Sequence, residues 1–186
     1  MPGIAITDHG NMYGVKEFFK VAKDFPEIKP IIGCEVYVTQ GYDHNLKDKD
    51  HKGYYHLILL AKNENGYRNL LKIVSEGHIN GMYYKPRVSH KIIEKYHEDL
   101  ICCSACLAGE IPRKIVAGDM KGAEESINWF KSLFGEDYYL EVQLHKTEVQ
   151  GLTGKAYDRV WEVYTNQLIS NEGIFSLAEK TGVKVI

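Results

Sequence analysis

The strongest constraint on the fold is that strand-length apolar segments alternate with amphipathic helix patterns along the whole chain. Residues 56–61 are apolar on both faces, as in a buried parallel strand. Residues 119–134 place Ala123, Ile127 and Phe130 at helical spacing, which predicts an amphipathic helix. Alternation of this kind is typical of a parallel sheet or barrel. We therefore expect an α/β fold whose spacing permits a (β/α) barrel that lacks at least one strand before residue 1.

The remaining elements are predicted from the same patterns. Residues 41–53 are polar and charged and are expected to form a mobile surface loop, whereas 81–87 form an aromatic and basic loop. Phe19 and Leu71 are expected on the inward faces of their helices, and Glu172-Gly173 predicts a break in the last helix. The expected strands are 3–6, 31–39, 56–61, 100–104, 138–144 and 183–186, and the expected helices are 13–25, 64–76, 90–96, 111–116, 119–134 and 157–181.

The composition limits the function classes. The chain has 186 residues, 44% of them hydrophobic, and its 23 Lys+Arg against 25 Asp+Glu give a formal net charge of −2. This balance gives no global basic surface for nucleic acid, so any such contact must be local or lie in further sequence. No apolar run is long enough to span a bilayer, and no signal peptide opens the chain. Four irregularly spaced cysteines fit reduced thiols in a cytoplasmic protein better than a disulfide framework.

Both ends of the sequence lie in predicted strands. Residues 1–3 lead directly into an apolar strand, and residues 183–186 stop inside another. A natural domain rarely begins and ends inside its own sheet. We therefore expect the chain to be a fragment, a partial domain over residues 1–186.

The first predicted strand ends in an acid and an imidazole. Asp8 and His9 follow the apolar segment directly, and the chain then turns at Gly10. In parallel α/β folds this end of a strand faces the active site. Asp8 and His9 are therefore candidates for chemistry, although Asp8 could equally cap the next helix and His9 could be an ordinary loop residue.

Other metal-binding side chains occur at or near strands. Glu35 lies within an apolar strand, His56 begins the next one, and Cys106 follows the fourth. A buried carboxylate needs a partner or a metal, because an unpaired one costs several kcal/mol. Imidazole, carboxylate and thiolate together suit zinc, iron or manganese. Glu141 and His145 of the fifth strand are further polar groups of this kind.

Each of these residues also has an ordinary structural interpretation. His56 could hydrogen-bond to backbone, Glu35 could pair with Lys29 or Lys62, and Cys106 could be a small buried apolar residue. Cys103 and Cys106 have the spacing of a redox or zinc pair, but no second pair accompanies them. The other histidines fall in polar segments and are expected to be exposed: His44, His51, His78, His90 and His97.

Seven segments together resemble a known family. They are similar, in the same order, to segments of the N-terminal polymerase-and-histidinol-phosphatase (PHP) domain of bacterial replicative DNA polymerase III alpha subunits. The resemblance covers nearly the whole chain and is highly specific. The segments are 2–14, 30–37, 56–61, 65–70, 83–87, 104–112 and 139–143.

The resemblance implies a distorted (β/α)7 barrel with up to three metals at its C-terminal face. His9, Glu35, His56 and Cys106 match metal-ligand positions of the family. Asp8 matches the motif but is expected to orient its neighbour rather than to bind a metal. Glu141 is a weaker candidate and could be structural.

The aromatic and basic loop has two interpretations. Lys85 and Arg87 could neutralise a phosphate of the substrate, or the loop could pack on the barrel rim.

Two parts of the family pattern are absent from this sequence. The family begins with a His-x-His strand and a nearby acidic residue, and it ends with an Asp-x-His pair beyond a strand like 183–186. About half of the ligand set therefore remains, and we expect metal in the isolated chain to be weakly bound, missing or bound in altered geometry, with little metal-dependent activity. A missing strand also exposes backbone groups of its neighbours, so we expect oligomerisation, local disorder or low solubility.

Three functions are compatible with the resemblance. The first is a fragment of the polymerase's PHP domain, which is a metal-dependent 3′–5′ exonuclease in some members and a scaffold for a separate proofreading subunit in others. Its partners would be DNA, deoxynucleotides and other replisome subunits, and magnesium would serve a polymerase site outside this chain. The second is a stand-alone PHP phosphoesterase similar to histidinol phosphatase, and the third is a pure interaction module. Residues 83–87 and 104–110 favour the polymerase branch.

Overall fold

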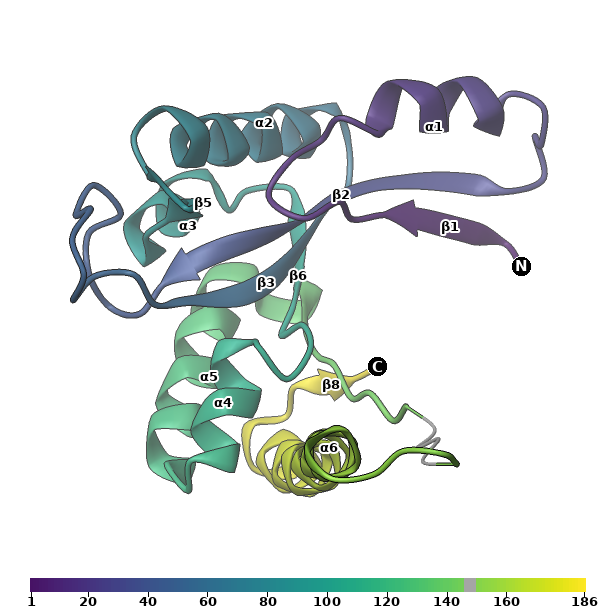
Figure 1. Ribbon diagram of the computed structural model, residues 1–186. Helices are drawn as coiled ribbons and strands as arrows, with labels where there is room; N and C mark the ends of the chain where they lie inside the picture. The colour runs from purple at the N-terminus through teal and green to yellow at the C-terminus, as the bar shows by residue number, and fades with distance from the viewer. Residues whose placement is uncertain (146–149) are drawn as a thin grey trace.

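The computed structural model describes residues 1–145 and 150–186, which form a mixed α/β fold around a curled sheet (Figure 1). The strand order is β4-β5-β2-β3-β6-β7-β8, and β1 also pairs with β2. The strands are β1 (Gly3–Ile6), β2 (Lys29–Thr39), β3 (Tyr54–Ala61), β4 (Met82–Tyr83), β5 (Lys85–Val88), β6 (Leu100–Cys103), β7 (Tyr138–Leu140) and β8 (Lys184–Val185). The helices are α1 (Val15–Ala22), α2 (Glu64–Ile79), α3 (His90–Tyr96), α4 (Glu110–Val116), α5 (Met120–Phe134), the 3₁₀ turn η1 (Gly135–Asp137) and α6 (Lys155–Thr181).

The long strand β2 organises the sheet. Its first residues pair with β1 in parallel, and its last residues pair with β5, also in parallel. Its other edge pairs with β3 from Gly33 to Thr39. Because all of these pairings share β2, side chains from distant parts of the sequence meet along this one strand.

The hydrophobic core lies on one face of the sheet. Alternate residues of β2 and β3, including Cys34, Val36 and Leu59, point into this core together with residues of α2, α4 and α5. The inward face predicted for α5 is confirmed, since Ala123, Ile127, Phe130 and Phe134 are all buried. Because side chains alternate along a strand, Glu35 and His56 are directed to the opposite face.

The central strands are antiparallel, not parallel as the sequence patterns predicted. β3 runs antiparallel to both β2 and β6, while β6, β7 and β8 are mutually parallel. In β3, Leu57 and Leu59 are buried on one face and Ile58 and Leu60 are partly buried on the other, a pattern that is independent of strand direction. The pattern therefore located the strand correctly and gave no information on its direction.

The predicted burial of the first strand and helix is wrong. Ile4 of β1 is 48% exposed and Phe19 of α1 is 46% exposed, and only Val15 of α1 is buried. In Figure 1 these two elements flank the start of β2 and form an arm beside the rest of the sheet. Within the described residues, β1 pairs with β2 alone, so much of the apolar surface of the arm faces solvent. Leu71 of α2, also predicted inward, is 38% exposed.

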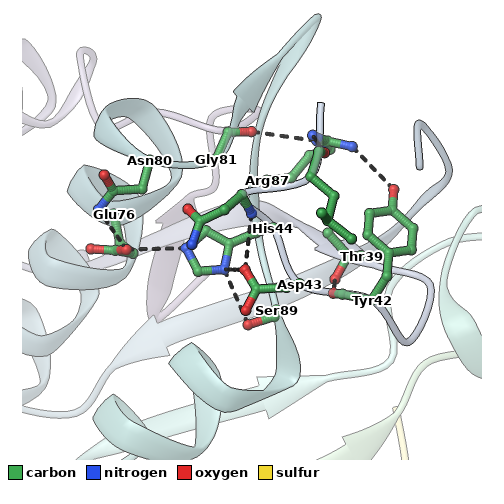
Figure 2. A network of polar contacts seen from close by, with 11 residues as sticks. Thr39, Tyr42, Asp43, His44, Glu76, Asn80, Gly81, Arg87 and Ser89 are labelled. Atoms are coloured by element: carbon green, nitrogen blue, oxygen red, sulfur yellow. Dashed lines mark hydrogen bonds and ion pairs between the residues drawn. The ribbon is translucent and has the colours of Figure 1, made fainter. Parts of the chain in front are cut away.

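The segment 41–53 is held by specific contacts, whereas the sequence predicted a mobile loop. His44, predicted to be exposed, is 4% exposed; its Nδ1 lies 3.2 Å from Ser89 Oγ and its Nε2 lies 3.0 Å from Glu76 Oε1 (Figure 2). Arg87 of β5 donates to the carbonyl oxygens of His51 and Leu46 in the same segment. A polar sequence therefore gives a fixed connection here, because its polar groups meet buried partners.

Two further elements differ from the sequence prediction. Residues 81–87 are not a simple loop, because β4 and β5 form a tight hairpin with Tyr84 at φ 61°. Helix α6 continues through Gly173 without a break. A Cβ at Gly173 would lie 2.5 Å from Ile115 Cγ2, so glycine allows α6 to pack closely on α4.

A search of the described residues for a membrane-spanning segment finds no helix that is both long enough and apolar enough.

Candidate metal centre

The site lies where β1, β2 and β3 come together. Beyond β1 the chain still follows β2, because the Gly10 N–H donates to the Glu35 carbonyl (2.8 Å) and the Glu35 N–H donates to the Asp8 carbonyl (3.1 Å). This pairing sets His9 beside Glu35. His56 lies on β3, the antiparallel neighbour of β2. The backbone thus brings two imidazoles to one carboxylate.

The side chains meet at a single carboxylate oxygen. Glu35 Oε1 lies 2.6 Å from His9 Nδ1 and 2.8 Å from His56 Nδ1. Cys106 Sγ lies 3.6 Å from the same nitrogen of His56. Glu35, His56 and Cys106 each offer a donor atom within 4.8 Å of the other two. His9 contacts Glu35 at the edge of this group, and its side chain is 71% exposed, compared with 10% for Glu35 and 20% for His56.

Cys106 reaches the site from a closed loop between β6 and α4. Gly109 N–H donates to the Cys106 carbonyl at 2.7 Å, and His56 N–H donates to the Ala108 carbonyl at 3.0 Å. The loop also contains Ala105, which is buried and has φ 63°. An L-residue in this left-handed region costs on the order of 1–2 kcal/mol, so the surrounding contacts must hold the turn that directs Cys106.

The charges within the group support one another. Burial disfavours an ionised Glu35, but hydrogen bonds and positive charge from His56 and His9 hold its pKa below the usual value. Hydrogen bonds to Cys106 and Glu35 raise the pKa of His56 to about 9. Burial also disfavours a Cys106 thiolate, yet His56 and the Ala108 backbone lower the pKa of this thiol. Without a metal, the arrangement favours a protonated imidazole between an ionised carboxylate and a thiol whose pKa is lowered.

The donor set fits a transition metal. It combines carboxylate oxygen, imidazole nitrogen and a thiol that is biased toward thiolate, which are the ligands that zinc and related ions accept. The PHP domain family model matches residues 1–145 of the chain. The chain belongs to the PHP domain family.

Relatives with curated names are similar to this PHP chain over most of its length. It is 49% identical over 157 residues (83% of the chain) to the DNA polymerase III subunit alpha of Borreliella burgdorferi. It is 47% identical over 146 residues (76%) to that of Treponema pallidum, and 34% identical over 194 residues (100%) to that of Chlamydia muridarum. The chain spans only 14%, 12% and 15% of the length of these proteins.

Asp8 of the PHP chain contacts the following loop rather than a ligand side chain. Its Oδ2 accepts a hydrogen bond from Gly14 N–H at 3.0 Å, and its carbonyl accepts from Cys34 Sγ at 3.3 Å. Gly14 is the residue before α1. Asp8 therefore fixes the turn that follows His9, but it does not cap α1, whose N-cap residue is Gly14 and which has no side-chain cap hydrogen bond.

The two basic residues proposed for phosphate lie in different environments. Lys85 is exposed, and its Nζ lies 5.4 Å from the centre of the Tyr37 ring, which in turn lies 5.3 Å from the His56 ring. Arg87 is fully buried and donates to backbone carbonyls, including that of Gly81, and to the Tyr42 hydroxyl (Figure 2). Of these two basic residues, Lys85 is the one whose charge is exposed near the centre.

The remaining polar candidates lie beside the Cys106 loop. Glu141 N–H donates to Ser104 Oγ at 2.8 Å, and its carboxylate accepts from the Gln143 side chain. The backbone N–H of His145 donates to the side-chain oxygen of Gln167 in α6 at 2.9 Å. Among the described residues, neither belongs to the group of three donors.

The structure does not favour the lysine pairing of Glu35 or the Cys103–Cys106 pair. Glu35 contacts His9 and His56, and Lys62 instead pairs with Asp137. Burial raises the pKa of Cys103 to about 12, which makes it a poor partner for a redox or zinc pair with Cys106.

Two aromatic residues beside the centre were not singled out from the sequence. Tyr54 stacks on His56 with ring centres 6.0 Å apart and an interplanar angle of 4°, and Tyr37 packs edge-on against His56. They lie two residues from His56 and from Glu35 in their strands, so strand alternation places them on the same face. The alternation of side chains along a strand is therefore the sequence signal that would have identified Tyr37 and Tyr54.

Proposed function

We propose that the chain is the N-terminal PHP part of a DNA polymerase III alpha subunit and that Glu35, His56 and Cys106, with His9, hold a divalent metal. The observation that carries the proposal is the convergence of three donor types within 4.8 Å. Zinc, manganese and iron are the metals that such a mixed set accepts. In the parent, the site would support hydrolysis of a phosphodiester at the 3′ end of DNA.

The side chains of this chain have separate tasks in that reaction. Glu35 is ionised at neutral pH and offers its carboxylate, and Cys106 is biased toward the thiolate. His56 must release its proton before its nitrogen can bind a cation, because its pKa is about 9. A bound divalent metal supplies the positive charge that ionises water and stabilises charge on a phosphate. Lys85, whose Nζ lies 5.4 Å from the centre of the Tyr37 ring, would neutralise a second phosphate oxygen.

The polymerase assignment also implies an activity and partners for the full-length parent protein. The parent would add deoxynucleotides to a primer in the cytoplasm, using magnesium at a site outside this chain. Its partners would be DNA and the other replisome subunits, including a proofreading subunit that the PHP domain could support as a scaffold. The names of the relatives favour this assignment over a stand-alone histidinol-phosphatase-like enzyme.

The proposed parent also explains the arm formed by β1 and α1. In a complete (β/α)7 barrel a further strand would pair with β1, and residues 1–186 would be part of one such PHP domain. The exposed apolar side chains Ile4, Phe19 and Phe25 would then be covered. Without that cover, the isolated chain is expected to self-associate through this arm, which size-exclusion chromatography with light scattering measures.

Metal content and phosphoesterase turnover of the purified chain test the proposal. We expect about one equivalent of metal, bound weakly, with little turnover, because only part of the family's ligand set is present. Cys106→Ala should lower the metal content of this chain and of the full-length parent. Unchanged metal content in the Cys106→Ala parent would remove Cys106 from the ligand set, and stoichiometric metal with robust turnover in the chain would contradict the partial-site account.

A further inference from the structure

A second charged cluster lies at the first turn of α4, outside the ligand group. Glu110 is 8% exposed, and both of its carboxylate oxygens have partners. Oε2 lies 2.8 Å from Nε2 of His90, and Oε1 accepts from Lys114 Nζ at 2.8 Å and from Ser126 Oγ at 2.6 Å. The cluster thus joins α3, α4 and α5 at one buried carboxylate.

This cluster is directly attached to the ligand loop. Glu110 follows Gly109, whose N–H donates to the carbonyl of Cys106 and whose backbone forms a bridge with His56. Ala108, one residue earlier, accepts the His56 N–H. A shift of the start of α4 would therefore move the backbone contacts of both Cys106 and His56.

The other end of the loop is attached to β7. Ser104 N–H donates to the Tyr139 carbonyl at 3.0 Å, and Ser104 Oγ accepts from Glu141 N–H. A Cβ at Gly109 would lie 2.1 Å from the Ser104 carbonyl oxygen, so the two ends of the loop touch. With the strained Ala105 between them, the loop needs firm attachment at both ends to keep its shape.

We propose that Glu110 is the positioning residue of the metal centre and that its bonds to His90, Lys114 and Ser126 hold the start of α4. Through Gly109 and Ala108, this anchor sets the separation of Cys106 and His56. Glu110 touches neither ligand side chain, so its effect passes through the backbone. The inference deepens the proposed function and rests on it where it concerns metal affinity.

Two variants and one control separate this role from general stabilisation. Glu110→Gln removes the carboxylate charge, and Ser126→Ala removes one hydrogen bond to it. The control is Glu76→Gln, because Glu76 also pairs with a buried histidine, His44, but attaches the segment 41–53 instead of the ligand loop (Figure 2). All variants are first compared by chemical denaturation.

Two measurements are made on each protein. Zinc affinity by competition titration should fall about tenfold in Glu110→Gln, the lower end of the effect of removing outer contacts of metal ligands, and less in Ser126→Ala. In metal-free protein, hydrogen exchange at the His56 and Gly109 amides should accelerate relative to the Leu59 amide in the sheet centre. Glu76→Gln should leave both measurements unchanged.

The outcomes distinguish the inference from the proposed function. Unchanged exchange at His56 and Gly109 in both variants, or an equal change in Glu76→Gln, overturns the positioning role even if zinc binds. Absence of zinc binding to the unmodified chain, with the expected exchange changes, overturns the proposed function and leaves the positioning of the loop supported. If Glu110→Gln does not fold, Ser126→Ala decides through the same two measurements.

Discussion

The two halves of the proposed ligand cluster are built in different ways. Glu35 and His56 stand on neighbouring strands at the centre of the sheet, and their side chains are 10% and 20% exposed. His9 stands on the arm formed by β1 and α1, and its side chain is 71% exposed. The comparison shows that the sheet and the loop of Cys106 together assemble three donors, while the arm adds a fourth group that is held only by local contacts.

The local contacts of the arm are few but specific. His78 Nε2 donates to the Gly10 carbonyl at 2.8 Å, and Gly14 N–H donates to Asp8. A Cβ at Gly10 would lie 2.7 Å from Tyr37 Cε2, so the turn after His9 packs tightly on β2. These contacts fix the turn but do not bury the arm.

The largest expected difference between the two regions is in stability. Leu59→Ala removes a fully buried side chain of the sheet core and should lower the free energy of unfolding by about 2–5 kcal/mol. Phe19→Ala in the arm should cost about 1 kcal/mol, because that side chain is 46% exposed. Urea denaturation of both variants checks this. Equal losses of unfolding free energy in the two variants would mean that the arm is packed in solution.

Acid should act on the core through Glu110. Burial opposes its charge, but His90, Lys114 and Ser126 lower its pKa from 4.5 to about 2. A lowered folded-state pKa adds stability above the unfolded value, and this contribution is lost as the pH falls from about 4.5 to about 2. This contribution of Glu110 to the free energy of unfolding is about 3 kcal/mol. Denaturation midpoints across this range should fall less steeply in Glu110→Gln, and parallel curves for the two proteins would contradict the assignment.

Metal affinity should depend on pH through His56, one of the proposed ligands. Because its pKa is raised to about 9, a metal competes with its proton at neutral pH. Affinity should therefore rise about tenfold for each pH unit up to about 9 and then level off. Zinc competition titrations from pH 6.5 to 9.5 measure this slope. A flat profile would indicate that His56 is not a ligand.

Removal of the arm ligand should have the smallest effect. His9→Ala leaves Glu35, His56 and Cys106 in place, so zinc affinity should fall less than tenfold. His56→Ala should reduce it far more under the same conditions. If the two variants lose affinity equally, the arm and the core contribute equally to the site, and the contrast between them is lost.

The sequence predicted the meeting of these side chains better than the fold around them. Glu35, His56 and His9 were expected together because they match family motifs, and the structure brings them to one oxygen. The antiparallel direction of β3 was missed because a strand apolar on both faces carries no sign of its direction.

Burial of polar groups was the other part that the sequence did not predict. Nothing local indicated that carbonyls of the segment 41–53 would converge on Arg87, or that Ser89 and Glu76 would enclose His44. These contacts depend on residues about 30–45 positions apart, and polar composition alone predicts a solvated loop.

Cobalt(II) titration, followed by the thiolate-to-metal charge-transfer absorption, tests the central claim most directly. If Glu35, His56 and Cys106 build the site without the arm, the chain should bind about one equivalent with this absorption. His9→Ala should keep the band and Cys106→Ser should abolish it. A band that survives in Cys106→Ser, or disappears in His9→Ala, would contradict a site formed by Glu35, His56 and Cys106.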